Sequence, residues 1–218
     1  SLQSSQQAKQ LLLGFGGKGA YSSHQILWQL FTEEDRRSFL FREEQLPDGS
    51  KVFYVLSSVA PKVDASLFQV QSKPFLPKLH IGQRLSYKLK ANPTVSVSDK
   101  QGKSKRHDVM MHAKRVAKER GVTDMEEVRV AMELAAREWM GNSKRLEGWG
   151  VSLDVLPNIE AYTQHRGDKS PTSAIRFSSV DYQGVLTVQD PDKFISQLEK
   201  GFGKSKALGC GLMLIKPI

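Results

Sequence analysis

The sequence predicts an α+β protein built from two similar units in tandem. The first half shows a helix followed by a hairpin, and the second half repeats the same kinds of element. Between them, Ala91-Asn92-Pro93 interrupts the pattern. The 218 residues and 39% hydrophobic content allow one large core or two cores of about 100 residues each.

The elements of the first half follow from local patterns. Apolar residues between Ile26 and Phe31 recur at helical spacing after Ser22-Ser23, which predicts a helix from Ser23 to Phe31. Ser38–Glu44 and Lys51–Ser57 are rich in aromatic and β-branched residues and flank Pro47-Asp48-Gly49, so a β-hairpin is expected. Residues 83–91 alternate apolar and polar side chains, as in a strand with one buried face.

The second half contains most of a βαββαβ unit. Its expected elements are a strand near Thr94–Val97, helices at Val109–Arg120 and Met125–Met140, strands near Val151–Ala161 and Ala174–Val188, a helix from Asp190-Pro191 to Gly201, and a strand at Leu212–Ile215. This is the ferredoxin-like order. We therefore expect two tandem ferredoxin-like domains, at residues 1–92 and 93–218. Because residues 1–10 are too polar for a strand, we expect the first strand of the N-terminal domain to be missing from this chain.

The composition favours a polyanionic partner. Lys and Arg number 32 against 23 Asp and Glu, which gives a net charge of +9. The single cysteine, Cys210, excludes an internal disulfide and fits a cytoplasmic protein. The sequence shows neither a signal peptide nor an apolar run of about 18 residues, so no membrane contact is expected.

Basic residues gather in two places that can track phosphates. The window between the halves holds Lys103, Lys105, Arg106, Lys114 and Arg115, partly in an expected mobile loop at 99–104. A second expected loop, at 165–171, holds Arg166 and Lys169, which can reach the backbone of an RNA helix. For the first window, a solvated linker and helix face is the alternative.

A run near the C-terminus combines four glycines with two lysines. These are Gly201, Gly203, Lys204, Lys206, Gly209 and Gly211. Glycines let backbone N–H groups approach phosphates closely, and lysines add charge. The run follows a helix and enters a strand, so it is not a nucleotide P-loop. A purely structural turn is the alternative.

These motifs carry a family resemblance. The run G-F-G-K-S-K-A-L-G-C-G followed by L-M-L-I resembles the C-terminal loop and last strand of CRISPR repeat endoribonucleases in the RAMP superfamily, and closest the CasE family of type I-E systems. Tyr21–Phe31 resembles that family's Y-x-x-H-x-x-L-W-x-L-F helix, Leu85–Pro93 its strand ending in A-N-P, and Tyr182–Val188 its G-V-L-T hairpin. The match spans Tyr21 to the C-terminus, and the missing apolar first strand is the departure.

The resemblance implies two ferredoxin-like domains and recognition of repeat hairpins in CRISPR precursor RNA. It implies cleavage at the 3′ base of the stem, and continued binding of the mature guide RNA beside the other Cascade subunits. The implied reaction is attack of a ribose 2′-OH on the adjacent phosphate, which leaves a 2′,3′-cyclic phosphate. Because the substrate supplies the nucleophile, the enzyme needs to align it and move protons, and no metal or cofactor is expected.

His24 suits this proton transfer. It falls in the first turn of the expected helix, where the positive end of the dipole disfavours imidazolium and keeps a neutral base near pH 7. Tyr21, at the helix entrance, can hydrogen-bond the 2′-OH or a phosphate oxygen. Whether His24 acts as base or acid stays open. Lys204 or Lys206 can stabilise charge on the phosphorane, although binding the RNA backbone is the favoured role.

Two other functions remain as alternatives. One is an RNA-hairpin-binding scaffold of the same superfamily that does not cleave, and the other is a basic structural subunit of a different complex. The pair Tyr21 and His24 favours the ribonuclease over the scaffold, since a binder does not need it. The basic loops and the glycine run favour the ribonuclease and the scaffold over the basic structural subunit.

Overall fold

The computed structural model describes residues 23, 27–31, 39–61, 69–98, 101–170 and 173–218. Its elements are η1 (Gln29–Phe31), β1 (Phe39–Gln45), β2 (Lys51–Ser57), β3 (Arg84–Ala91), β4 (Thr94–Ser98), β5 (Ser104–Asp108), α3 (Val109–Glu119), α4 (Met125–Gly141), α5 (Ser143–Trp149), β6 (Val151–Ser152), β7 (Asn158–Ser170), β8 (Ser173–Val188), α6 (Pro191–Lys200), η2 (Lys206–Leu208) and β9 (Met213–Pro217). The fold is α+β, as predicted.

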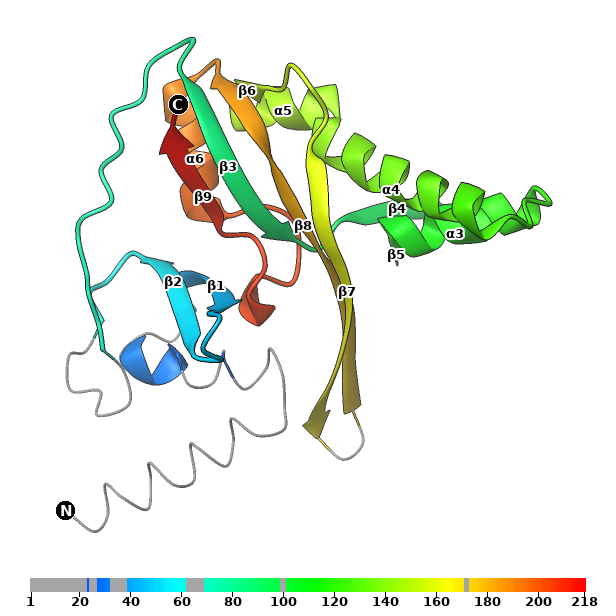
Figure 1. Cartoon of the computed structure of the whole chain (residues 1–218), viewed down its shortest axis with the longest axis horizontal. Coiled ribbons are helices and arrows are strands. Elements are labelled where there is room, and N and C mark those ends of the chain that lie inside the picture. Colours follow the sequence, from blue (N-terminus) through cyan, green and yellow to red (C-terminus); the bar gives the residue numbers. More distant parts are fainter. Residues whose placement is uncertain (1–22, 24–26, 32–38, 62–68, 99–100, 171–172) are drawn as a thin grey trace.

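A five-stranded antiparallel sheet forms the centre of the molecule (Figure 1). Strand β3 lies between β8 and β9, and β7 pairs with β8. If β3, β7, β8 and β9 are taken as the four strands of one βαββαβ unit, their order across the sheet is fourth, first, third, second. Helices α4 and α5 follow the first strand, and α6 connects the third to the fourth. This is a ferredoxin-like unit.

The sheet draws strands from both sides of the expected boundary between residues 92 and 93. Strand β3 precedes that position, whereas β6 to β9 follow it. The segment 94–97, which was expected to open the second unit, instead pairs as β4 with β5 in a separate two-stranded sheet. The prediction assigned each strand to its nearest neighbours in sequence, but β3 pairs with residues of β8 that lie 89 to 103 positions later.

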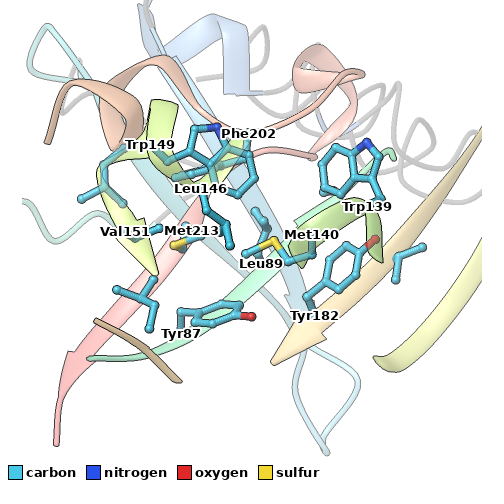
Figure 2. Packing of buried hydrophobic residues seen from close by; sticks show 14 of the residues in the cluster. Tyr87, Leu89, Trp139, Met140, Leu146, Trp149, Val151, Tyr182, Phe202 and Met213 are labelled. Carbon is cyan, nitrogen blue, oxygen red and sulfur yellow. The ribbon is translucent and has the colours of Figure 1, made fainter. Parts of the chain in front are cut away.

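Alternation along β3 defines the two faces of this sheet. Leu85, Tyr87 and Leu89 are at most 2% exposed, whereas Lys88 and Lys90 point to the opposite face. On the buried face, aromatic rings from distant segments pack together (Figure 2). Tyr182 stacks on Trp139, with ring centroids 6.0 Å apart. Burial of Tyr182 raises the pKa of its phenol. The phenol hydroxyl donates a hydrogen bond at 2.9 Å to the carbonyl oxygen of Ala136 in α4.

The first half forms a smaller core around the β1–β2 hairpin. Within the expected helix, residues 23, 27 and 28 are helical, and η1 completes it as a 3₁₀ turn. Leu27, Leu30 and Phe31 pack against Phe39 and Phe41 of β1. The strand register and the turn at Pro47-Asp48-Gly49 confirm the predicted hairpin. Residues 1–22, in which no first strand is expected, lie outside the described residues.

Further elements differ from the prediction. Helix α5 was not expected, and its seven residues cap on Asn142 and end at Gly150 in a left-handed conformation. The loop expected at 165–171 is mostly strand, since β7 runs to Ser170 and pairs with β8 as a long ribbon. Within the described residues, positions 173–179 of β8 pair with β7 and with no other strand. The ribbon extends beyond the rest of the sheet (Figure 1).

Gly201 connects the two cores. It ends α6 with φ 73° and ψ 166°, a backbone region that is essentially restricted to glycine. A Cβ at this position would lie 2.7 Å from Cδ1 of Leu40 in β1 and 3.0 Å from the carbonyl oxygen of Gly211. Glycine is therefore required both by the backbone and by the close approach of the hairpin.

We predict that Gly201→Ala lowers the free energy of unfolding by about 2–5 kcal/mol, because backbone strain and overpacking add. Gly49→Ala is the matched control. Gly49 also has a positive φ, of 83°, but an added Cβ there meets nothing within 4 Å. The Gly49→Ala substitution should lower the free energy of unfolding by about 1–2 kcal/mol. Urea denaturation of both variants checks this, and equal losses would mean that the contact with Leu40 contributes nothing.

Candidate nucleic-acid interface

The glycine-rich loop, residues 201–211, is fixed against the end of β3. The side-chain amide of Asn92 donates to Oγ of Ser205 at 2.7 Å, and the Asn92 carbonyl oxygen accepts from the backbone N–H of Lys204 at 3.4 Å. The N–H of Gly211 donates to the carbonyl oxygen of Lys90 at 2.7 Å. Ser205 has a left-handed backbone, with φ 54°. The A-N-P motif and the glycine run, 113 residues apart, thus form one structure.

The glycines of this loop approach protein atoms closely. A Cβ on Gly203 would lie 3.1 Å from the carbonyl oxygen of Asn92, and one on Gly209 would lie 3.1 Å from the ring of Phe41. At Gly211 it would lie 2.8 Å from the carbonyl oxygen of Phe202. The structural alternative therefore accounts for all four glycines. A role in phosphate binding stays a prediction.

The two lysines of the loop have different surroundings. Lys204 is exposed. Lys206 is half-buried, and its Nζ donates at 2.6 Å to the carbonyl oxygen of Lys200, in the last turn of α6. Cations at a helix C-terminus complement its orphan carbonyl groups. Lys206 thus has a structural partner, and Lys204 is the better candidate for contact with a ligand.

The predicted catalytic residues, Tyr21 and His24, lie outside the described residues. Two neighbours of His24 are described. Ser23 is buried, and its hydroxyl donates a hydrogen bond to the carboxylate of Glu43 in β1, which also pairs with Lys51 at 2.7 Å. Leu27 is 1% exposed in the small core. The residues on both sides of the 24–26 segment are therefore held against β1.

Arg42, in β1, joins the hairpin to the central sheet, and sequence reasoning missed it. The side chain is 9% exposed, and it pairs with Glu44 at 2.8 Å and with Asp181 of β8 at 3.1 Å. Lys90 lies 3.9 Å from the same aspartate. One guanidinium nitrogen of Arg42, Nη1, is buried without a hydrogen-bond partner. Only the tertiary structure reveals this arrangement, because a charged residue within a strand does not by itself indicate burial.

These residues line a groove of about 370 Å³ between β1 and the open face of the sheet. Its walls carry both signs of charge. The residues that line it are Arg42, Glu43, Glu44, Gln45, Lys88, Lys90, Glu160, Ala161, Asp181, Tyr182 and Gln183. Its charged side chains are three cations, Arg42, Lys88 and Lys90, against four carboxylates. The groove is therefore not a basic surface.

The expected basic window folds into the β4–β5 hairpin and α3. Lys103, Lys105 and Arg106 are exposed at the start of β5, and Arg106 and Lys105 point to opposite faces of the hairpin. On α3, Arg115 is exposed and Lys114 is half-buried. Lys105 and Arg115 act together on His107, whose pKa is lowered by burial and then by these positive neighbours. The structure thus brings part of the window onto one surface.

The β7–β8 ribbon carries Arg166 and Lys169 on its β7 strand, where only the backbone is described. Nearer the sheet, the His165 ring stacks on Phe177 at 4.4 Å and lies 2.8 Å from Oγ of Ser179. In the parts of the chain that the structure describes, no three His, Cys, Asp or Glu side chains are grouped closely enough to hold a metal. Within the same residues, none of the helices is both long and apolar enough to cross a lipid bilayer.

Comparison with known proteins places this arrangement in a family. The sequence profile of the CRISPR associated protein family matches residues 2–217. The chain therefore belongs to the family of CRISPR associated proteins. Within it, the chain is 30% identical over 203 residues to the CRISPR system Cascade subunit CasE of Escherichia coli strain K12, which covers 91% of this chain and 92% of that protein. The predicted resemblance to CasE is confirmed.

Other relatives agree. The chain is 32% identical over 147 residues to the CRISPR-associated endoribonuclease Cse3 of Thermus thermophilus, which covers 66% of this chain and 61% of that protein. A solved structure of CRISPR endoribonuclease Cse3 bound to a 19-nucleotide RNA has a TM-score of 0.67 and 26% identity, over 92% of this chain and 91% of that chain. A structure of Thermus thermophilus Cse3 bound to an RNA that represents a pre-cleavage complex has a TM-score of 0.66 and 26% identity. The match covers 91% of this chain and 89% of that chain.

The two lysines of the glycine-rich loop should separate binding from stability. We predict that Lys204→Ala weakens binding of an RNA hairpin and leaves the melting temperature unchanged, because the side chain is exposed. Lys206→Ala removes a bond to the end of α6 and should lower the free energy of unfolding by about 0.5–1.5 kcal/mol. Filter binding and thermal denaturation of both variants test this. A loss of stability without loss of affinity in Lys204→Ala would make the loop purely structural.

Proposed function

We propose that this chain is an endoribonuclease that binds repeat hairpins in CRISPR precursor RNA and cleaves at the 3′ base of the stem. The reaction is attack of the ribose 2′-OH on the adjacent phosphate, which gives a mature guide RNA with a 2′,3′-cyclic phosphate. The observation that carries the proposal is the glycine-rich loop, which is bonded to Asn92 and packed against β1, the strand that also holds Ser23. The names of the relatives, CasE and Cse3 endoribonuclease, support it.

His24 is the proposed proton-transfer group, and Tyr21 is its partner. His24 directly follows Ser23, whose bond to Glu43 anchors the helix start on β1. Near the positive end of a helix dipole, an imidazole stays neutral and can accept a proton from the 2′-OH, or, once protonated, donate one to the 5′ oxygen. Tyr21 would orient the 2′-OH or a phosphate oxygen. The substrate supplies the nucleophile, so this scheme uses no metal and no cofactor.

The basic surfaces supply affinity. We assign binding of the hairpin backbone to Lys103, Lys105, Arg106, Lys114 and Arg115 on the β5–α3 surface, Arg166 and Lys169 on the ribbon, and Lys204 with Lys206 in the loop. A-form RNA presents mainly phosphates to protein side chains along its deep major groove, and a two-stranded ribbon that projects from the sheet can reach them. The net charge of +9 favours such contacts.

We further propose that the protein keeps its product and acts as a Cascade subunit in the cytoplasm. The relative from Escherichia coli is named as a Cascade subunit, and the chain covers 92% of it. Cys210, the sole cysteine, is buried. A reducing compartment suits such a chain, which has no disulfide to form.

A scaffold that binds RNA hairpins without cleaving them is the second candidate. The same loop, ribbon and basic surfaces would serve it. The retained pair Tyr21 and His24 favours cleavage.

We predict that His24→Ala lowers the single-turnover cleavage rate by about 10²- to 10⁴-fold, because general acid–base catalysis has this magnitude. Binding of an uncleavable 2′-deoxy hairpin should stay close to that of the wild type. Tyr21→Phe should lower the cleavage rate by a smaller factor, because it removes one hydrogen bond and leaves the proton-transfer group in place. Rates are measured at saturating protein with EDTA present throughout.

The matched control is His80→Ala, since His80 is exposed in the loop before β3 and has no proposed role. Its rate should equal the wild-type rate. If His24→Ala also cleaves at the wild-type rate, the catalytic assignment is wrong. A parallel loss of rate and affinity would make His24 a docking residue, and wild-type protein that binds without cleaving would support the scaffold.

We also predict that simultaneous Lys103→Ala, Lys105→Ala and Arg106→Ala flattens the salt dependence of hairpin binding. Each lost phosphate contact should reduce the slope of log affinity against log salt by roughly 0.7–0.9, since fewer counterions are released. Replacing Lys73, Lys78 and Lys216, which are exposed elsewhere, removes the same charge and should keep the slope. An unchanged slope in the first variant would make the window a solvated surface.

A further inference from the structure

Two histidines lie together where β5 turns into α3. His107 is the second-last residue of β5, and His112 is in the first turns of α3, with the two ring centroids 5.8 Å apart. Both side chains are half-buried. Lys105 precedes His107 by two residues on the same face of the strand, and Arg115 follows His112 by three on the helix. Two imidazoles and two permanent cations thus share one surface.

Arg115 contacts the ring of His112 through its guanidinium group. Nη2 of Arg115 lies 3.1 Å from Nδ1 of His112. A guanidinium can only donate, so a hydrogen bond at this distance uses Nδ1 as the acceptor. A proton on Nδ1 would face the arginine donor. An anionic oxygen placed between the two groups can accept from both of them.

Few opposite charges neutralise this surface. Arg115 lies 3.6 Å from Glu119, an exposed pair of small energetic weight. Asp108, next to His107, is already bound to the N–H of Met111 and the hydroxyl of Ser178. Strand β4 presents Val95 opposite His107. Helix α4, packed along α3, directs Arg129 to its own Glu126 and Glu133.

The surroundings of His107 in the free protein disfavour its charged form. The pKa of His107 is lowered, first by burial and then by Arg115, His112 and Lys105. A phosphate group reverses the sign of the local field and offers several acceptor oxygens. Each imidazole can donate to it when protonated.

We infer that His107, His112, Lys105 and Arg115 form a binding site for a phosphate group of the RNA backbone that takes up protons when it is occupied. This rests on the proposed function, which assigns Lys105 and Arg115 to the hairpin, and it adds the two histidines and a dependence on pH. Bound phosphate raises the imidazole pKa values above those of the free protein. Affinity therefore increases as the pH falls through the window between the two sets of values, and levels off on either side.

The test is binding of an uncleavable 2′-deoxy repeat hairpin by the full chain, measured by filter binding from pH 5.5 to 8.5 at constant ionic strength. Linkage limits the effect to tenfold in Kd per pH unit for each proton taken up. We expect the wild type to bind about tenfold tighter at pH 6 than at pH 8. The double variant His107→Gln, His112→Gln should lose most of this dependence, and His80→Gln should keep it.

An NMR titration of the wild-type histidine ring protons, with and without the hairpin, measures the same linkage without mutation. Two imidazole pKa values should rise in the complex, and they are assigned by their absence from the double variant. A pH dependence equal in the wild type and the double variant, or imidazole pKa values that do not move, overturns the inference while binding itself persists. Failure of the wild type to bind the hairpin at any pH would instead contradict the proposed function.

Discussion

The packing of the glycine-rich loop against β1 is the constraint on which the rest of the structure depends. Gly201 and Gly209 let Leu40 and Phe41 approach the backbone, and Asn92 bonds the loop to the end of β3. The loop therefore touches the small core of the first half and the large core of the second at once. A side chain at these glycines would separate the loop from β1, on which Ser23 and Leu27 are held.

A second link between the cores is ionic. Arg42 carries a buried charge from β1 to Asp181 on the central sheet, where Lys90 also approaches. A buried ion pair is weak evidence for stability, because desolvation offsets much of the attraction, but removal of one partner leaves an uncompensated charge. Apolar contact sets the distance between the two halves, and this pair restricts how they can slide. The groove beside it is lined by residues of β1, β3, β7 and β8.

Apart from Lys204 and Lys206 of the glycine-rich loop, the residues proposed to bind RNA lie on elements outside this junction. The ribbon is an extension of two central strands, and the β5–α3 surface is tied to β8 through the bond between Ser178 and Asp108. Basic residues can therefore stand on separate elements while a rigid sheet keeps their spacing. Phosphate contacts need charge at suitable distances more than they need exact side-chain geometry, so such a surface tolerates sequence change better than the glycine-rich loop does.

The sequence by itself determined the local elements and the family. Capping residues and alternation predicted α6, β3 and the β1–β2 hairpin, because these signals act between near neighbours. It also supplied Tyr21 and His24 as candidates. Only the tertiary structure decided that β3 pairs with β8 and β9, that Arg42 is buried beside Asp181, and that His107 faces His112. These contacts join residues on different elements, and their partners depend on how the sheets pack, which no local pattern encodes.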